Sequence, residues 1–386
     1  MKEKKHKIAM IGHKRIPSRE GGVEIVVEEL SSRLVNDGYD VVAFNRKGKN
    51  VQDSNADKSN KKIKEYKGIR LKRVFTINKK GIDALLYSIN ATIKALFGHF
   101  SILHYHAEGC SAMTWLPHLF HKKIVVTIHG LDWQRGKWAS ADGKLGIGAK
   151  YILHGEKNAV KYADEIIVLS KNMQKYFKDT YNRDTVLIAN GVSKPTNKTA
   201  NIITEKYGLK EDDYILFLAR IVPEKGLDYL IDAYKQLDTD KKLVIAGGPS
   251  HSVDYYNEIQ EKVKYNSNII MTGFVQGEEL EELFSNCYLY CLPSDVEGMP
   301  LTLLEAMSYG RNVLTSDIPE NTEVTEDYGT SFRKSDVDDL KAKLEACLKG
   351  KNRKTEEEIS NYILNKYSWD KNAKETEKIY NKFIKK

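Results

Sequence analysis

Two cations in the second half of this 386-residue chain are spaced to hold an anion. Arg220 and Lys225 flank a turn, ARIVPEKG, between an apolar run and a helical stretch. A helix N-terminus offers unpaired N–H groups, and two fixed cations beside it suit a diphosphate. Taken alone, the same pattern also fits a solvated surface turn, so its meaning depends on its neighbours.

Two glutamates, Glu297 and Glu305, lie in the stretch PSDVEGMPLTLLEAMSYG. Glu297 is expected in a loop and Glu305 inside a helix over Pro300–Tyr309, whose first N–H groups, at Leu301 and Thr302, would face an anion. A carboxylate beside an anion site is unfavourable unless it holds hydroxyl groups, and a ribose diol fits that role. Taken alone, each glutamate is more simply explained as a solvated carboxylate.

The first half offers Gly21–Gly22, just before a predicted helix, and His129, at the end of a predicted strand. Paired glycines let the backbone approach a ligand closely, although a tight turn without a ligand explains them too. They do not form G-x-G-x-x-G, so the dinucleotide fingerprint is absent. His129 could simply cap its strand. Leu131–Trp138 carries two Trp and two cations, which suit a sugar and an anionic acceptor or else pack, and Ala139–Gly148 after it is expected to order on binding.

Short, near-continuous apolar runs alternate with helical patterns along the whole chain, as in parallel sheets covered on both faces. The sequence therefore predicts an α/β fold with one doubly wound parallel sheet in each half. The expected strands are Lys7–Gly12, Asp40–Asn45, Ile69–Phe75, Ile102–His106, Ile124–His129, Glu165–Ser170, Thr185–Ala189, Tyr214–Ala219, Lys242–Ala246, Asn268–Thr272, Cys287–Leu292 and Asn312–Thr315.

The helical periodicity breaks near Asn190–Asn201, which gives domains 1–195 and 196–366. A C-terminal helix within 367–386 is expected to pack back on the first domain. Residues 46–67 are polar and predict a surface loop. Two Rossmann-like halves place a ligand between them, at the carboxyl ends of the strands.

The ordered set Arg220-x4-Lys225-Gly226 and Glu297-x7-Glu305 resembles the donor site of the retaining nucleotide-sugar glycosyltransferases of family 4, which have the GT-B fold. Gly21–Gly22, the TIHG stretch that contains His129, and Gly273-Phe274-Val275 extend the resemblance over nearly the whole chain. GHKRIPSREGGVEIVVEEL also resembles bacterial enzymes that build surface polysaccharides such as capsule, including rhamnosyltransferase-like members.

This resemblance implies a role for each matched position. Arg220 and Lys225 would grip the donor diphosphate and stabilise the leaving charge, Glu305 would bind the ribose, and Glu297 would bind hydroxyls of the donor sugar. The remaining donor contacts would be Gly21, Gly22, His129, Val275, Gly298, Met299, Pro300, Leu301 and Thr302. Transfer would retain the anomeric configuration, with the departing phosphate taking the acceptor proton.

Neither a metal nor another cofactor is expected, since fixed cations would replace the metal. Asp238-Thr239-Asp240 is a D-x-D triplet, but it precedes a predicted strand and is interpreted as a turn. The four cysteines show no metal or redox spacing, and no apolar run is long enough to span a bilayer. A cytoplasmic protein is therefore expected.

Charge is unevenly distributed: residues 1–195 hold 35 Lys and Arg against 19 Asp and Glu, whereas residues 196–386 hold 26 against 34. A basic first half suggests an anionic partner, although a solvated surface with a chance charge bias explains it equally well. Ile82–Phe100, preceded by Lys79–Lys80, is interpreted either as a core helix or as an amphipathic helix on an anionic inner membrane face, with Trp115–Phe120 as a second contact. A polyprenyl-diphosphate-linked or other glycan acceptor would suit such a surface.

Other classes fit less well. A GT-B-fold sugar-nucleotide epimerase would need further acid/base carboxylates, and a phosphorylase would need a cofactor lysine and a longer chain. A non-catalytic GT-B subunit that supports a partner glycosyltransferase stays open, although Arg220, Lys225 and Glu297 are all present. No RNA-binding aromatic motif or zinc finger supports nucleic-acid binding. The expectation is a glycosyltransferase of the hexosyltransferase class.

Overall fold

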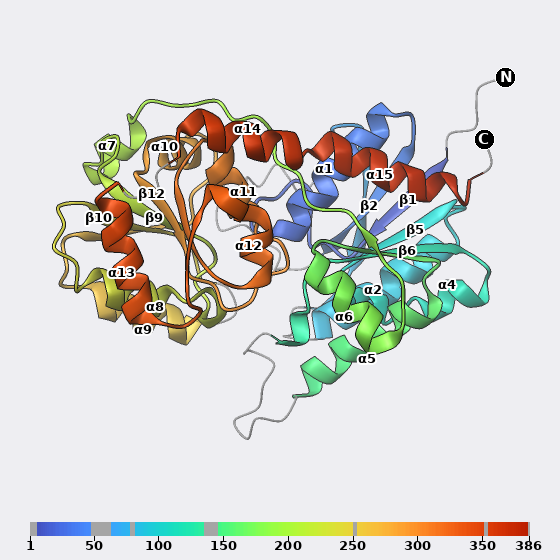
Figure 1. Cartoon of the computed structure of the whole chain (residues 1–386). Helices are drawn as coiled ribbons and strands as arrows, with labels where there is room; N and C mark the ends of the chain where they lie inside the picture. Colours follow the sequence, from blue (N-terminus) through green and yellow to red (C-terminus); the bar gives the residue numbers. More distant parts are fainter. Residues whose placement is uncertain are drawn as a thin grey trace. The chain divides into compact units, whose positions relative to one another are not determined.

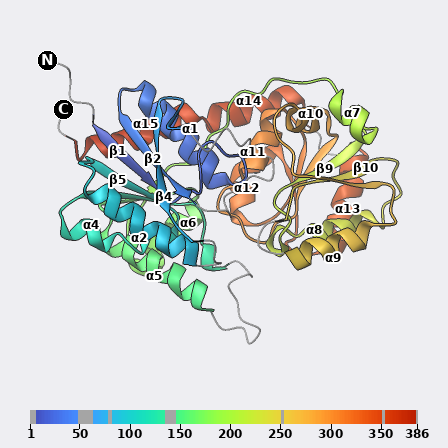
Figure 2. The same ribbon diagram turned by 180° about the vertical axis from the view of Figure 1, so that it is seen from behind.

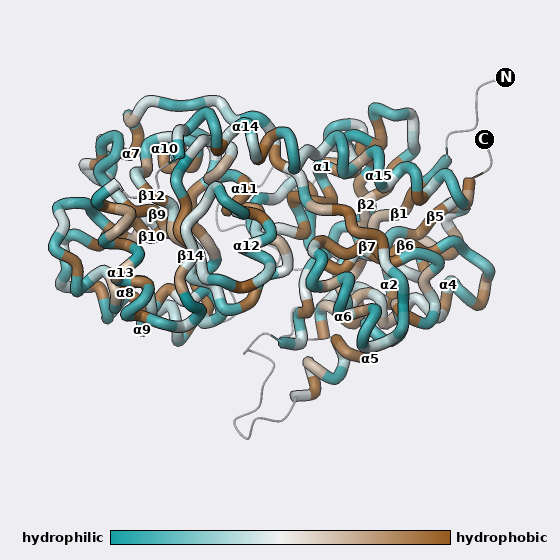
Figure 3. Tube along the Cα trace, in the orientation of Figure 1, coloured by the Kyte–Doolittle hydropathy of each residue, from teal (hydrophilic) through white to brown (hydrophobic). Residues whose placement is uncertain are grey.

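The chain forms two compact units in a computed structural model that describes residues 6–47, 63–77, 82–134, 146–249, 253–350 and 354–384. Unit 1 comprises Met1–Asn190 and Trp369–Lys386, and unit 2 comprises Gly191–Ser368. Each unit is an α/β sandwich with helices on both faces of its sheet (Figures 1 and 2). In each, the apolar residues follow the central strands and the hydrophilic ones lie outside (Figure 3).

Unit 1 contains a sheet in the order β3-β4-β2-β1-β5-β6-β7-β8, in which only the β3–β4 pair is antiparallel. Its strands are β1 (Lys7–Ile11), β2 (Asp40–Lys47), β3 (Glu65–Tyr66), β4 (Ile69–Phe75), β5 (Ile102–His106), β6 (Lys123–Ile128), β7 (Glu165–Val168) and β8 (Val186–Leu187). Its helices are α1 (Gly22–Asn36), α2 (Ile82–Leu96), α3 (Glu108–Ser111), α4 (Trp115–Leu119), η3 (Asp132–Gln134), α5 (Ile147–Tyr162), α6 (Lys171–Tyr181) and α15 (Trp369–Asn381).

Helices α1 and α15 lie side by side on one face of this sheet (Figures 1 and 2). Helix α1 buries Val27, Leu30 and Leu34, a spacing of three and four residues that forms one apolar face. Helix α15 adds Ile379 and Tyr380 to the same hydrophobic cluster. The last helix of the chain thus belongs to the core of the unit that contains its first strand.

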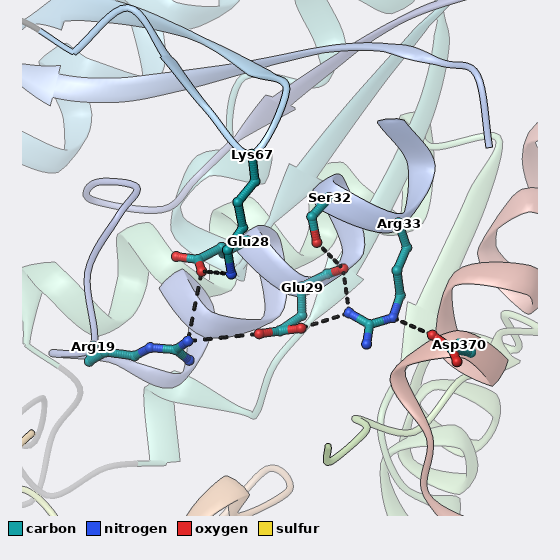
Figure 4. Close-up of polar contacts among 7 residues, drawn as sticks. All are labelled: Arg19, Glu28, Glu29, Ser32, Arg33, Lys67 and Asp370. Atoms are coloured by element: carbon teal, nitrogen blue, oxygen red, sulfur yellow. Dashed lines mark hydrogen bonds and ion pairs between the residues drawn. The ribbon is translucent and has the colours of Figure 1, made fainter. Parts of the chain in front are cut away.

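Ion pairs and hydrogen bonds connect α1 to the segments around it (Figure 4). Arg19, in the loop before α1, lies 3.7 Å from a carboxylate oxygen of Glu28 and 3.8 Å from one of Glu29. Glu28 also accepts a 2.9 Å hydrogen bond from Lys67, in the β3–β4 turn. Single surface ion pairs contribute little, but here two cations share one carboxylate that is almost fully buried. The network holds the loop that leads into Gly21–Gly22.

Unit 2 contains a parallel sheet in the order β11-β10-β9-β12-β13-β14. Its strands are β9 (Tyr214–Leu218), β10 (Lys242–Ala246), β11 (Ile269–Gly273), β12 (Leu289–Leu292), β13 (Val313–Ser316) and β14 (Thr330–Phe332). Its helices are α7 (Ile202–Tyr207), η5 (Pro223–Lys225), α8 (Leu227–Tyr234), α9 (Val253–Val263), α10 (Glu278–Asn286), α11 (Leu301–Ser308), α12 (Pro319–Thr325), η6 (Glu326–Tyr328), α13 (Val337–Leu348) and α14 (Glu356–Lys366).

All twelve strands expected from the sequence are present, with ends that differ by at most two residues. The surface loop predicted over 46–67 is wrong at both ends, because Arg46 and Lys47 extend β2 and Glu65–Tyr66 forms β3; residues 48–62 lie outside the described ones. Strand β14, in which only Phe332 is buried, was not predicted from the sequence. Short edge strands with solvated side chains carry no apolar pattern to detect.

Candidate active site in each unit

In unit 2 the strand order reverses between β9 and β12, which are neighbours in the sheet. Ligands of open α/β sheets bind outside the carboxyl ends of the strands at such a reversal point. Lys225 follows β9 and Glu297 follows β12, and here Nζ of Lys225 donates a hydrogen bond to Oε1 of Glu297. The two side chains keep only 13% and 8% of their surface exposed. The fold thus joins two residues that lie 72 positions apart.

Backbone contacts fix the turn that carries Lys225. Gly226 ends η5 with φ 62°, and a Cβ atom on it would lie 2.1 Å from the carbonyl oxygen of Pro293. Only glycine lets the two loops come this close. The amide of Asp295 donates a 2.9 Å hydrogen bond to the carbonyl of Glu224 and joins the loops a second time. Lys225 therefore stands on a rigid support.

Asp295 is a further site element that the sequence analysis missed. Its carboxylate accepts hydrogen bonds of 3.0 Å from the hydroxyl of Tyr229 and 2.7 Å from that of Ser335. It therefore connects the loop before Glu297 to α8 and to the segment after β14. The sequence signal for this residue was an Asp three residues after a buried strand. That signal is weak, because a solvated Asp in a loop gives the same pattern.

Helix α11 begins at Leu301, with Pro300 as its N-cap rather than in its first turn, where the sequence analysis placed it. The hydroxyl of Tyr290, a buried residue of β12, lies 2.8 Å from Oγ1 of Thr302. Gly298 and Met299 are buried in the preceding loop, and Glu305 is half-buried one turn into the helix. The N–H groups of the first turn are thus anchored at the same edge of the sheet as Lys225.

Residues after the carboxyl ends of β10 and β11 form the rest of this edge of the unit 2 sheet. Gly247 has φ 151°, and a Cβ atom on it would lie 1.9 Å from the carbonyl oxygen of Ala219, directly before Arg220. Val275, which follows β11, is buried, and Arg220 is half-buried in the turn after β9. Gly247–Gly248 was not predicted as part of the site, although it is a pair of glycines after a strand, the same signal that Gly21–Gly22 gives.

In unit 1, Gly22 opens α1 and Gly21 is its N-cap. The buried carboxylate of Glu24 accepts a 2.7 Å hydrogen bond from the amide of Lys14. A Cβ atom on Gly21 would lie 2.2 Å from the other carboxylate oxygen of Glu24. Glycine at position 21 therefore makes room for an acidic side chain in the first turn of the helix, which its dipole favours.

His129, after β6, meets a second histidine that the sequence analysis did not select. Nε2 of His129 lies 3.1 Å from Nδ1 of His106, the last residue of β5. The strand order of unit 1 reverses between β1 and β5, and a Cβ atom on Gly12 would lie 2.0 Å from the carbonyl oxygen of His106. Both histidines therefore mark the place where a ligand of this sheet is expected.

Two buried glutamates lie beneath the segment after His129. Glu108 accepts a 3.0 Å hydrogen bond from the amide of Asp132, and Glu156 accepts one of 3.2 Å from the indole of Trp133. Burial, followed by the nearby charge of Asp132 and a hydrogen bond with Glu156, raises the pKa of Glu108 well above its ordinary value. The predicted acceptor contacts at 135–138 and most of the loop 139–148 lie outside the described residues.

Within the described residues, no group of three or more His, Cys, Asp and Glu side chains is arranged to hold a metal ion. The D-x-D triplet Asp238–Asp240 lies between α8 and β10 and precedes the strand. All four cysteines are free thiols, three of them buried.

Family models match both units. Residues 20–194 match the model "Glycosyltransferase Family 4", and residues 200–366 match "Glycosyl transferases group 1". An uncharacterized glycosyltransferase of Methanocaldococcus jannaschii is 26% identical over 371 residues, 93% of this chain and 94% of the relative. The O-antigen chain mannosyltransferase B of Escherichia coli is 29% identical over 144 residues, 36% of this chain and 38% of the relative.

Solved structures resemble the whole chain. Sucrose-phosphate synthase from Thermosynechococcus elongatus superposes with a TM-score of 0.81 at 20% identity, over 98% of this chain and 99% of its own. The HepE protein of Anabaena, solved with UDP and glucose, gives 0.78 at 16% identity, over 98% and 100%. The chain is therefore a glycosyltransferase with the GT-B fold, built from a Glycosyltransferase Family 4 domain and a Glycosyl transferases group 1 domain.

Proposed function

We propose that the enzyme moves a sugar from a nucleotide-diphosphate donor to a carbohydrate acceptor and retains the anomeric configuration. The observation that carries this proposal is the Lys225–Glu297 pair at the strand reversal of unit 2, next to the N-terminus of α11. A cation can neutralise the leaving diphosphate, while an adjacent carboxylate holds sugar hydroxyls. The complex of HepE with UDP and glucose supports this class of donor.

The proposed roles are those that the family resemblance implies for these positions. Arg220 and Lys225 stabilise the charge that develops on the diphosphate, Glu297 holds the sugar, and Glu305 holds the ribose. The acceptor oxygen attacks the anomeric carbon from the face that the diphosphate leaves, and the departing phosphate oxygen takes the acceptor proton. Fixed cations perform the neutralisation, so the proposed reaction uses no metal ion. In unit 1, His129 contacts the donor sugar and Gly22 approaches the diphosphate.

We further propose a lipid-linked acceptor in bacterial surface-polysaccharide synthesis, which the O-antigen mannosyltransferase relative supports. Helix α2 buries Tyr87 and Ala91 against the sheet, whereas Ile93 is 41% exposed and Phe97, directly after the helix, is 74% exposed. These two side chains border a hollow of about 830 Å³, whose other lining residues are five cations, one acid and one leucine: Lys64, Arg70, Lys72, Arg73, Lys94, Glu65 and Leu71. Apolar groups beside cations suit an anionic membrane surface.

The sequence left open whether Ile82–Phe100 packs in the core or touches a membrane. Its helix, α2, ends at Leu96, and Phe100 is buried beyond it. One face of α2 therefore packs in the core, and the exposed side chains of Ile93 and Phe97 belong to a separate surface. On α4 and directly after it, Leu119 and Phe120 are exposed to 64% and 55%. The described residues include no helix that is both long and apolar enough to cross a bilayer.

A donor screen tests the transfer proposal. Purified enzyme is heated with UDP-, dTDP- and GDP-sugars, and each donor that raises the melting temperature is offered an acceptor while product anomers are identified by NMR. A donor at 100 times its Kd should add about 2.7 kcal/mol of apparent stability. A product of inverted configuration would contradict the retaining step. If the protein binds no sugar nucleotide, the result would instead support the alternative, a non-catalytic GT-B subunit.

A further inference from the structure

The contact between His106 and His129 in unit 1 is an edge-to-edge contact of two imidazole rings. Nδ1 of His106 and Nε2 of His129 are 3.1 Å apart, whereas the ring centroids are 5.3 Å apart and the planes differ by 28°. The centroid distance exceeds the N–N distance by about the radii of the two rings. The two nitrogens therefore point at each other, as a hydrogen bond requires.

His106 is held in place on its other side. Its ring stacks on that of His104, with centroids 4.2 Å apart. His104 is itself fixed, because Oγ1 of Thr127 lies 2.7 Å from its Nε2 and the hydroxyl of Tyr380 lies 2.6 Å from its Nδ1. Strands β5 and β6 and helix α15 thus contribute to a buried row of polar rings that ends at His129.

One proton must be placed on the neutral ring of His106. Burial and the neighbouring rings of His104, His129 and His13 lower the pKa of His106 well below its ordinary value, so the ring is neutral. Its Nε2 atom is buried and has no hydrogen-bond partner among the described residues. A proton on Nε2 would be a buried donor without an acceptor, which proteins rarely contain. The proton therefore resides on Nδ1, which faces His129.

We propose that His106 is a positioning residue, which donates its Nδ1–H to Nε2 of His129 and thereby fixes both the ring orientation and the tautomer of His129. With Nε2 engaged as an acceptor, His129 carries its own proton on Nδ1 and can donate only from there. The meaning for catalysis rests on the proposed function, in which His129 contacts the donor sugar. Nδ1–H is then the group that donates to a sugar oxygen.

NMR of the enzyme with ¹⁵N-labelled histidine tests the tautomer directly, since long-range ¹H–¹⁵N correlations distinguish Nδ1–H from Nε2–H. Assignment comes from the signals lost in His106→Asn and His129→Gln. Both rings are expected in the Nδ1–H form in the wild-type enzyme at pH 8. A wild-type His129 in the Nε2–H form would overturn the proposal. This measurement needs no activity, so its outcome is independent of whether the enzyme transfers sugar.

Two variants test the consequence. His106→Leu removes the donor, so His129 is expected to lose its single tautomer and kcat to fall on the order of 10-fold, with KM for the donor changed less. His106→Asn places an amide nitrogen where Nδ1 was and should restore both the tautomer and most of kcat. His154→Leu, on the exposed face of α5, is the matched control. An unchanged kcat in His106→Leu would refute the positioning role, even if the tautomer changed.

Discussion

The ammonium group of Lys225 and the carboxylate of Glu297 form an ion pair at the edge of the unit 2 sheet, with most of both side chains buried. In the proposed reaction, the pair would supply a cation for the donor diphosphate and a carboxylate for its sugar, from two loops that Gly226 and Asp295 hold together. It also means that neither residue can be removed without a cost to stability, because a buried charge without a partner is unfavourable.

Lys225→Ala should therefore lower both transfer and stability. Transfer should fall at least about 100-fold, as when other transition-state charge contacts are removed. The melting temperature should fall because Glu297 loses its partner, and the double variant Lys225→Met/Glu297→Gln should regain stability but not activity. Lys262→Ala, whose ion pair with Asp232 lies on the surface of α8 and α9, is the control. Near-normal turnover of Lys225→Ala would remove Lys225 from the donor site.

Substitutions of the two glutamates should have different effects on ligand binding. Glu305→Gln should weaken binding of the free nucleotide, because a charged hydrogen bond to the ribose becomes neutral. Glu297→Gln should leave free nucleotide binding unchanged and weaken binding of the sugar nucleotide. Calorimetric titration of both variants with nucleoside diphosphate and with the complete donor measures the difference. Equal loss of nucleotide affinity in both would contradict the division of roles.

Transfer should persist in excess EDTA, since the proposed neutralisation of the diphosphate relies on Arg220 and Lys225. The assay compares initial rates of the dialysed enzyme with chelator, without chelator and with added Mg²⁺ or Mn²⁺. Loss of activity in chelator that either ion restores would show that a metal is required.

The free energy of unfolding should depend on pH through the buried carboxyl group of Glu108, which lies beside Glu156. The pKa of Glu108 is raised in the folded protein above its ordinary value of 4.5, so the folded state binds a proton that the unfolded state releases above that pH. Stability should therefore decrease as pH rises from about 4.5 toward the raised pKa. In Glu108→Gln this decrease should be smaller. Urea unfolding of both proteins at pH 5, 6, 7 and 8 measures the decrease. If the unfolding free energies of the two proteins change with pH in parallel, Glu108 makes no such contribution.

Vesicle sedimentation tests the surface beside α2. Wild-type enzyme should bind anionic and not neutral vesicles, and binding should weaken as salt rises. Phe97→Ser and Lys72→Glu should each reduce binding without affecting donor binding, the charge reversal by several-fold, because each cation contributes about 1 kcal/mol. Tyr265→Ser, an aromatic residue 90% exposed in unit 2, is the control. Equal binding to neutral vesicles would argue against recognition of charge. Lys79 and Lys80 lie outside the described residues.

The sequence was sufficient to predict the strands that carry the site, because parallel strands buried on both faces form continuous apolar runs. It could also place Lys225 after one predicted strand and Glu297 after another. It could not show that the two side chains pair, because that depends on which loops the sheet order brings together. His106 was missed for a similar reason: a histidine within a strand looks like any buried polar residue until its neighbour after β6, His129, is known.

The position of α15 has a consequence for how the protein is made. The hydroxyl of Tyr380 lies 2.6 Å from a ring nitrogen of His104, and Ile379 and Tyr380 belong to the cluster that includes Ile8 and Met10. The chain passes through all of Gly191–Ser368 before it supplies this helix. Unit 1 therefore cannot complete its core until α15 is made, whereas unit 2 does not need that helix for its own core. A chain truncated before Trp369 should show a protease-sensitive first unit beside a resistant second one.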